Sequence, residues 1–363
     1  MNNRKLVLEN GIVFEGIGFG SLKETVAEMI FYTSVVGYQE ILSDPSNCDK
    51  MICMTYPLIG NYGMTDEDYE SKYIKAKALV VREYNEFPSN FRYTKTLDEV
   101  MEENDVCGIS GIDTRYLMKL IKQYNNIKAL ICDIDKPIDE CLELIKNYKE
   151  SANLVSLVSS KKIWFSRTPN PIYNIAFIDL GTKINYVRRL NNFGCNVIIF
   201  PYNTSKEDIM KYKPNALFIS SGPGNPEELN EISKLIKKFI GKMPIFGIGL
   251  GMELIAHSYG INTIKMTSGH HGSNYPVRNI QSNKIEITSQ NHLYTIDKEN
   301  FNNSNLIVTH LNVINNEIEG FYDELNKVKA IQFEPNVPID ENSEDLFKEF
   351  LNMIKVKGAR KRG

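Results

Sequence analysis

The sequence lacks the features that define several common protein classes. Its six cysteines include no Cys-x-x-Cys pair, which argues against a zinc ribbon or a disulfide scaffold and favours a reducing compartment. No run approaches the roughly 18 apolar residues that a membrane-spanning helix needs, and the first residues form no apolar signal segment. The net charge of −3 gives no basic footprint for nucleic acid. We therefore expect a cytoplasmic protein without membrane or nucleic-acid partners.

Nucleotide-binding motifs are missing as well. The turn Gly247-Ile248-Gly249-Leu250-Gly251 has one residue between its second and third glycines, where a dinucleotide fingerprint has two. No acidic residue follows about 20 positions later, where the ribose partner would lie. The chain also contains no Gly-x-x-x-x-Gly-Lys-Ser/Thr. We expect this chain to hold no cofactor and no metal.

The N-terminal part combines short strands with helices. Asn10-Gly11 lies between two apolar stretches of residues 5–20, which predicts a β-hairpin. Further predicted strands are 27–33, 51–55 and 74–81, and predicted helices are 97–103, 114–124 and 138–149. The stretch 151–171 loses periodicity and ends in Thr168-Pro169-Asn170-Pro171, where two prolines oppose regular structure. We therefore predict a domain over 1–150 and a linker over 151–171.

The part that follows alternates strands and helices. Predicted strands are 173–179, 196–200, 215–219 and 244–248, and predicted helices are 183–193, 206–211, 226–240 and 251–258. A β-rich stretch over 260–335 and a helix over 342–354 complete the pattern. This rhythm predicts an α/β fold with a doubly wound, mostly parallel sheet over 172–357, whose sites lie at the carboxyl ends of the strands. Residues 358–363 read as a basic tail.

Two turns in this second domain are candidate site elements. In residues 244–256 an apolar strand runs into a glycine-rich turn and then a helix, and Gly249 is at the apex. Such an elbow usually presents a nucleophile, and glycine accepts the positive φ of the apex without strain. The turn Ser220-Ser221-Gly222-Pro223-Gly224-Asn225-Pro226 could hold an anion on its backbone N–H groups, or could be only a tight loop.

Longer motifs in both halves resemble the small, glutamine-amidotransferase subunit of carbamoyl-phosphate synthase. They are residues 33–46, 55–63 and 111–115 in the first half, and 178–185, 220–226, 269–274 and 289–292 in the second. The resemblance covers essentially the whole chain. It implies an N-terminal small-subunit α/β domain that docks on a large subunit, followed by a class I glutamine amidotransferase domain. The large subunit would use ATP, Mg and bicarbonate to make carbamoyl phosphate for arginine and pyrimidine synthesis.

The sequence departs from this family at its catalytic triad. The family's elbow reads Gly-x-Cys-x-Gly-His-Gln, so the nucleophile position is Gly249 here. The family's His-Pro-Glu matches Glu334-Pro335-Asn336, so glutamate replaces the base and asparagine replaces its orienting acid. The resemblance therefore implies that no catalytic residue is intact and that glutaminase activity is lost.

The family's glutamine-binding positions are partly retained. The retained positions are Ser46, Gly222, Gly224, Leu250 and Asn291, and the altered or variable positions are Glu253, Leu293 and Tyr294. Leu293 replaces a glycine where the backbone must approach the ligand closely, and overpacking costs about 1–3 kcal/mol. Glu253 replaces a glutamine and brings a negative charge. We expect glutamine binding to be weak or absent.

Three hypotheses stay open from the sequence. The chain could be a small subunit whose complex runs on free ammonia, as the resemblance allows because an ammonia-dependent relative is known in the wider family. It could instead be an inactive paralogue that binds and regulates the large subunit. A third hypothesis is an altered enzyme that uses Glu253 and Glu334 as paired acids on another substrate.

Overall fold

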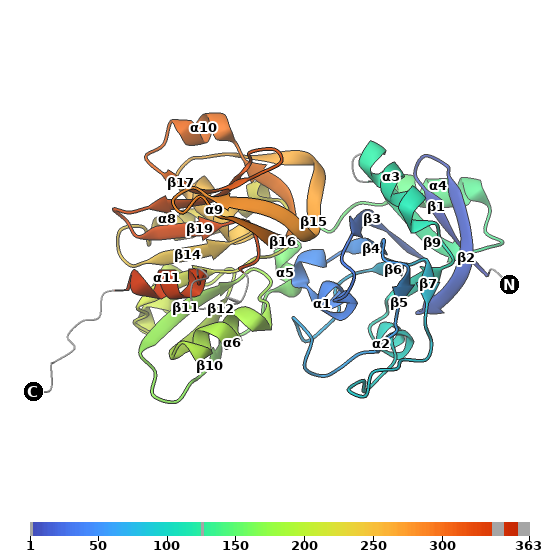
Figure 1. Ribbon diagram of the computed structural model, residues 1–363, viewed down its shortest axis with the longest axis horizontal. Helices are drawn as coiled ribbons and strands as arrows, with labels where there is room; N and C mark the ends of the chain where they lie inside the picture. Colours follow the sequence, from blue (N-terminus) through green and yellow to red (C-terminus); the bar gives the residue numbers. More distant parts are fainter. Residues whose placement is uncertain (1–2, 125–126, 336–344, 355–363) are drawn as a thin grey trace, which may run out of the picture. The chain divides into compact units, whose positions relative to one another are not determined.

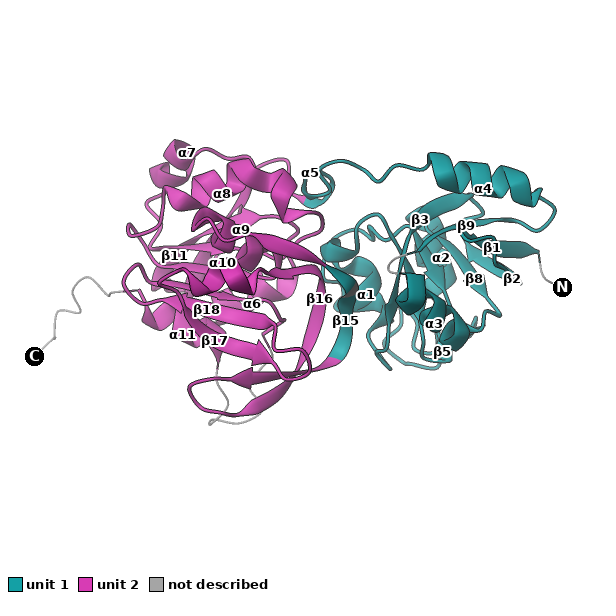
Figure 2. Ribbon diagram, turned by 90° about the horizontal axis from the view of Figure 1, so that it is seen from above, with its two compact units in different colours: residues 1–158, 266–273 teal, residues 159–265, 274–363 magenta. Residues whose placement is uncertain are grey.

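The computed structural model describes residues 3–124, 127–335 and 345–354, and the chain divides into two compact units (Figures 1 and 2). Unit 1 contains residues 1–158 and 266–273, and unit 2 contains residues 159–265 and 274–363. The change of unit after Val158 falls within the stretch 151–171 that the sequence predicts as a linker.

Unit 1 is built around a closed barrel of seven strands in the order β1-β2-β8-β6-β4-β3-β9. The strands are β1 Arg4–Leu8, β2 Val13–Gly20, β3 Thr25–Tyr32, β4 Lys50–Met54, β6 Ala78–Val80, β8 Cys107–Ser110 and β9 Lys128–Asp133. The predicted hairpin is confirmed, because Val7 pairs with Val13 across a turn in which Gly11 has φ 85°. The strand predicted over 74–81 is shorter than expected, since β6 covers only its end.

The barrel strands alternate between two apolar clusters. One set of side chains, including Leu6, Met29 and Met51, packs with helix α3 (Thr114–Tyr124). The other set, including Ile30 and Ile52, packs with α1 (Tyr38–Ser43) and α2 (Leu97–Glu103). The remaining elements of unit 1 are η1 Pro45–Asn47, β5 Leu58–Ile59, β7 Glu83–Tyr84, α4 Ile138–Asn147 and α5 Val155–Val158.

The predicted linker contains regular structure that the sequence did not indicate. Helix α5 lies inside it, and β10 (Trp164–Ser166) pairs antiparallel with β12. A three-residue strand leaves too little pattern to recognise, and it forms because β12 offers an edge for its backbone. The expectation of irregular structure over the whole of 151–171 is therefore wrong.

Unit 2 contains a ten-stranded sheet in the order β10-β12-β11-β13-β14-β19-β18-β17-β15-β16 (Figure 1). Its other strands are β11 Tyr173–Asp179, β12 Cys195–Pro201, β13 Ala216–Ile219, β14 Ile245–Ile248, β15 Thr263–Asn279, β16 Ile285–Ile296, β17 Ile307–Asn312, β18 Ile318–Asp323 and β19 Val328–Ile331. Residues 266–273 of β15 are assigned to unit 1. Strands β12, β11, β13, β14 and β19 run parallel to one another, as predicted, and β12 and β19 pair antiparallel with β10 and β18 at the two ends of this group. Their carboxyl ends form one edge, where sites of such sheets lie.

Helices cover both faces of the parallel part. On one face α6 (Ile184–Asn192) and α11 (Leu346–Asn352) enclose a core in which Phe218 stacks on Phe177 at 4.6 Å between ring centroids. Phe246 and Ile248 of β14 face this core, so Gly247 between them faces α9 (Leu250–Ser258) on the other side. The remaining helices of unit 2 are α7 Lys206–Lys211, η2 Pro226–Leu229, α8 Asn230–Lys237 and α10 Lys298–Asn302.

Some predicted boundaries differ from the structure. The helix predicted over 226–240 begins as the 3-10 turn η2, because Asn225 caps the N–H of Glu227 and Pro226 occupies the first position. The helix predicted over 342–354 begins with Leu346, and residues 342–344 lie outside the described part. Among the described residues, no helix combines the length and the apolar character needed to cross a bilayer.

Candidate functional site

The strand–turn–helix elbow lies at the carboxyl end of β14, with Gly249 at its apex. Gly249 has φ 56° and ψ −120°, a conformation that L side chains rarely adopt. Its N–H donates to the carbonyl of Ile331, and its own carbonyl accepts from Met252 and Glu253 in the first turn of α9. The backbone of a nucleophile elbow is therefore present, and its apex carries no side chain.

The three elbow positions 247, 249 and 251 differ in whether packing requires glycine there. A Cβ on Gly251 would lie 2.5 Å from the carbonyl oxygen of Ile219, so only glycine lets α9 approach β13 this closely. A Cβ on Gly247 would lie 2.4 Å from Cδ1 of Ile255 and 2.9 Å from the backbone of Gly251. A Cβ on Gly249 would meet Ser221 Cβ at 3.3 Å, which a small local adjustment can accommodate. Packing requires glycine at 247 and 251, whereas at 249 it leaves room for a side chain.

Glu334 lies close to this elbow, after the end of β19. Its N–H donates to the carbonyl of Ser289 on β16, which brings residue 334 next to the strand that carries Asn291. Oε1 of Glu334 accepts a bond of 2.7 Å from Nζ of the buried Lys183, and Oε2 accepts from the hydroxyl of Tyr186. Both carboxylate oxygens of Glu334 are thus engaged by residues at the start of α6.

Tyr186 and Ser221 connect Glu334 to the apex. The Tyr186 hydroxyl gives its proton to Glu334, so Ser221 Oγ, 3.3 Å away, is the donor to Tyr186. Burial, and then the Glu334 carboxylate, raise the pKa of Tyr186 well above its ordinary value, so the phenol stays protonated. The Cβ of Ser221 lies 3.3 Å from the position that a Cβ on residue 249 would occupy, so this serine is the neighbour of the apex.

The turn that follows β13 lies next to the elbow, because it contains Ser221, the neighbour of the apex. A Cβ on Gly222 would lie 2.1 Å from the carbonyl oxygen of Leu180, so this glycine is fixed by packing alone. Gly224 has φ 107°, which also favours glycine. The survival of both glycines has a structural explanation and does not require that the turn bind a ligand.

Glu253 is the second unusual carboxyl of the site, and it is buried in the first turn of α9. Its Oε1 accepts a hydrogen bond of 2.8 Å from the side-chain amide of Gln332. Burial raises the pKa of Glu253 to about 8, and the hydrogen bond from Gln332 only partly opposes this shift. The negative charge that the sequence suggests at 253 is therefore largely neutralised by protonation near neutral pH.

The other expected binding residues fall in three places. Leu250 is buried at the start of α9, and Asn291, Leu293 and Tyr294 are half-buried on β16 of the same unit. Ser46 belongs to unit 1, where its N–H donates to Asp44. Asn336 lies outside the described residues.

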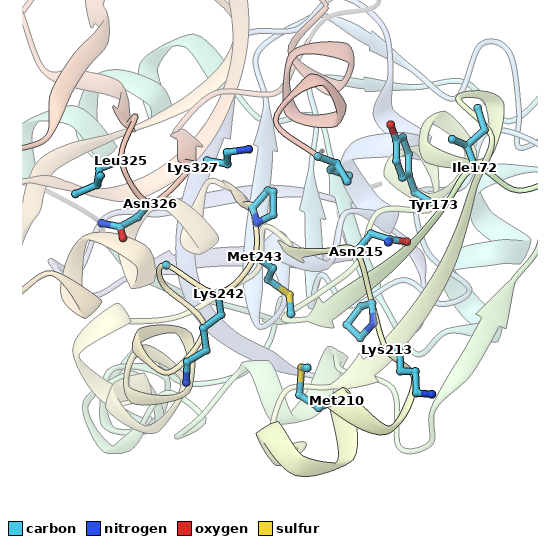
Figure 3. Close-up of a pocket in the computed structure, with 14 residues that line it drawn as sticks. Ile172, Tyr173, Met210, Lys213, Asn215, Lys242, Met243, Leu325, Asn326 and Lys327 are labelled. Atoms are coloured by element: carbon cyan, nitrogen blue, oxygen red, sulfur yellow. The ribbon is translucent and has the colours of Figure 1, made fainter. Parts of the chain in front are cut away.

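A cavity of about 810 Å³ lies at the opposite edge of the sheet (Figure 3). It is lined by residues at or just before the amino ends of four parallel strands, including Tyr173, Asn215, Pro244 and Lys327. It contains none of the expected site residues. Figure 3 shows Lys213 and Lys242 pointing away from each other, so their ammonium groups do not converge on one ligand. We therefore place the candidate site at the elbow.

Comparison with known proteins agrees with the two-unit organisation. The family described as carbamoyl-phosphate synthase small chain, CPSase domain, matches residues 6–131, and glutamine amidotransferase class-I matches residues 176–354. The carbamoyl phosphate synthase small chain of Bacillus caldolyticus is 41% identical over 353 residues, covering 97% of this chain and 96% of the relative. The chain belongs to the carbamoyl-phosphate synthase small-chain family.

Other members of the family match over similar lengths. The pyrimidine-specific small chain of Bacillus subtilis is 41% identical over 352 residues, covering 97% of this chain and 96% of that protein. The small chain of Fusobacterium nucleatum is 40% identical over 355 residues, with coverages of 98% and 99%. These relatives support the role of a synthase small subunit for this chain.

Sequence reasoning gave no individual role to four residues that shape the site, Lys183, Tyr186, Ser221 and Gln332, although Ser221 lies in the candidate turn 220–226 and Lys183 in the motif 178–185. Lys183 and Tyr186 lie about 150 positions before Glu334, and no local pattern connects them. The sequence does offer one signal for these two residues, which is their position at the start of the helix after β11. That helix begins at the carboxyl edge of the sheet, where the elbow also lies.

Proposed function

We propose that this chain is the small subunit of a carbamoyl-phosphate synthase and does not itself hydrolyse glutamine, so that the complex runs on free ammonia. The observation that carries this proposal is the elbow with Gly249 at its apex. Amide hydrolysis through a covalent intermediate needs a nucleophilic side chain and a base that removes its proton. Residue 249 supplies neither thiol nor hydroxyl.

The neighbouring groups do not replace the missing chemistry. Ser221 is a neighbour of the apex and carries a hydroxyl, but the hydrogen-bond partner of that hydroxyl is the protonated phenol of Tyr186, which is not a base. Glu334 occupies the family's base position, and Lys183 and Tyr186 engage both of its carboxylate oxygens. Both oxygens of Glu334 are therefore occupied by donors and are not open to a proton from a nucleophile. These contacts also weigh against paired acid catalysis by Glu253 and Glu334.

The substrate positions support the same proposal. Glu253 replaces the glutamine of the family elbow, and its carboxyl is buried against Gln332 rather than open to a ligand. Leu293 adds bulk on β16 where the family has glycine. Ser46, Gly222, Gly224, Leu250 and Asn291 are the retained positions, and we infer that they do not suffice for tight glutamine binding.

The partner in this proposal is the large subunit of the synthase, on which the N-terminal domain docks. ATP and Mg would bind to that subunit, and it would form carbamoyl phosphate from bicarbonate and ammonia for arginine or pyrimidine synthesis. This chain would contribute a stable surface for assembly and no ammonia of its own.

Reconstitution with the large subunit from the same genome tests the proposal. We expect carbamoyl phosphate to form with ammonium chloride and not with glutamine. Comparable rates with both donors would overturn the loss of glutaminase activity. A pair that assembles but makes no product from either donor would favour the second hypothesis, a regulatory paralogue.

A variant with Gly249→Cys, Glu334→His and Asn336→Glu tests whether the triad positions are assigned correctly. We expect it to gain measurable glutamine hydrolysis, which the parent chain lacks. The matched control keeps Gly249 and carries only Glu334→His and Asn336→Glu, and it should remain inactive because the nucleophile is absent. If the triple variant is inactive, adding Leu293→Gly determines whether the leucine blocks the pocket.

A further inference from the structure

Unit 1 displays two phenylalanines on one short loop, at a place where nothing in the described chain covers them. Phe87 is 82% exposed and Phe91 is 95% exposed. Both belong to the segment Asn85-Glu86-Phe87-Pro88-Ser89-Asn90-Phe91-Arg92-Tyr93, between β7 and α2. Exposing two such side chains to water is unfavourable for a free surface, because each ring can bury about 150 Å² or more in a contact.

The loop is held in place along its length. The N–H of Asn85 donates to the carbonyl of Ile59 at 2.8 Å, and the N–H of Ser89 donates to the carbonyl of Asn61 at 3.0 Å. After the second phenylalanine, Thr94 N–H donates to Met64 at 2.8 Å, which fixes the exit toward α2. The base of the loop is therefore tied to the 59–64 segment on both sides.

Side-chain contacts within the loop fix the turns that present the rings. Asn85 Oδ1 accepts from the N–H of Phe87 at 3.1 Å, and Asn90 Oδ1 accepts from the N–H of Arg92 at 3.1 Å. These are local turns of the kind that asparagine stabilises. Both phenylalanines are thus pre-positioned, so their burial against a partner would cost little ordering of the backbone.

The charges around the rings indicate what kind of surface would fit. The guanidinium of Arg92 is already paired with Glu67 at 2.8 Å and Asp68 at 3.5 Å, so two carboxylates share one cation. Glu86 adds an exposed carboxylate next to Phe87. The rim of the aromatic pair is therefore acidic, and a complementary surface has apolar pockets surrounded by lysine or arginine.

We propose that the loop 85–93 is an anchor of this chain on the synthase large subunit, with Phe87 and Phe91 entering apolar pockets that have a basic rim. The inference rests on the proposed function, which makes the large subunit the partner, and adds the surface that binds it. Exposed aromatic side chains on a fixed loop have the character of interface hot spots. The match of the small-chain domain family to residues 6–131 includes the loop.

The affinity for the large subunit tests this anchor. The large subunit from the same genome is titrated with three chains: the parent, a Phe87→Ala/Phe91→Ala variant and a Leu325→Ala control. Leu325 is 90% exposed and belongs to unit 2, so its truncation removes an exposed apolar side chain that is not part of the loop. We expect the double variant to weaken binding at least about 30-fold, and the control to change it less than about twofold. Unchanged thermal unfolding of the double variant shows that it is folded.

The outcomes separate the two proposals. If the parent chain does not bind the large subunit, the proposed function fails. If the parent binds and the double variant binds equally well, the anchor is wrong and the function stands. A photo-crosslinking side chain, Phe91→p-benzoylphenylalanine, gives a second readout: we expect crosslinks to the large subunit, and none from the same group at Leu325. Crosslinks from Leu325 only would overturn the anchor.

Discussion

The side-chain amide of Gln332 donates a hydrogen bond of 2.8 Å to the buried carboxyl of Glu253, in the first turn of the helix that follows Gly249. This contact connects the end of β19 with the first turn of α9. Because Glu253 is buried away from water, the pH at which its carboxyl loses a proton depends on whether the chain is folded.

We expect Glu253 to make the stability of the chain depend on pH. Its pKa is raised from 4.5 to about 8, so the folded chain keeps a proton that the unfolded chain releases between these values. The stabilisation that this retained proton gives to the folded chain is fully present below about pH 4.5 and is lost as the pH rises through 8. Glu253→Gln removes the titration and should stabilise the chain by about 2–5 kcal/mol at pH 9.

Thermal unfolding from pH 5 to pH 9 measures this effect. Glu207→Gln serves as the control, because it removes an exposed carboxyl on α7. Parallel pH curves for the parent and Glu253→Gln would contradict the assignment of Glu253 as the buried titrating group.

The contact between Lys183 and Glu334 should couple the stability effects of their substitutions. Lys183→Met leaves the Glu334 carboxylate with the Tyr186 hydroxyl as its described partner, and Glu334→Gln removes a negative charge 2.7 Å from the buried ammonium of Lys183. We expect a double-mutant cycle in urea to give a coupling of about 1–3 kcal/mol. The exposed pair Lys234 and Glu231 provides a control cycle, in which we expect no measurable coupling. Equal results in the two cycles would refute the engagement of Glu334.

The glycines of the elbow should differ in their tolerance of alanine. Gly251→Ala places a methyl group against a backbone oxygen and should destabilise the chain by about 3 kcal/mol. Gly249→Ala meets mainly the strain of a positive φ and should cost about 1–2 kcal/mol. Gly260→Ala is the matched control, since φ there is +80° and a Cβ meets nothing within 4 Å. A loss at Gly249 well above that at Gly260 would show that the apex has no room for a side chain.

The cysteines should be unreactive while the chain is folded. All six are buried, and burial raises the pKa of Cys48 and Cys195 to about 11 and, with the neighbouring thiol of Cys141, the pKa of Cys132 to about 12. We expect a chromogenic disulfide reagent to label no thiol quickly in the native chain, and all six in urea. Ser282→Cys adds an exposed thiol as a positive control. Rapid labelling of the parent would show that a buried segment opens readily.

The sequence was most informative where chemistry depends on a short local motif. Gly249 could be recognised as an elbow apex because strand, turn and helix follow one another in 13 residues, 244–256. The parallel order of β11, β13 and β14 followed from the alternating pattern. The closed barrel of unit 1 could not be foreseen, because it depends on pairings such as β1 with β9 that join distant residues.

The hydrogen-bond partners and protonation states of the side chains around the site were harder to predict. The sequence presented Glu334 only as the residue at the family's base position, whereas the structure places Lys183 and Tyr186 against it. It presented Glu253 as a negative charge, whereas burial favours its neutral form. Both differences arise from packing between segments distant in sequence, which decides solvation and therefore protonation.

Packing fixes glycine at 247 and 251 but not at 249, and this difference has a consequence for how the gene can change. The glycine codons GGT and GGC differ from the cysteine codons TGT and TGC by a single first-position base, G against T. Because glycine suits the backbone at 249 and the flanking glycines keep the turn in shape, that exchange changes the chemistry without dismantling the domain. An elbow of this kind can therefore exchange cysteine for glycine at its apex through one base change and keep its fold.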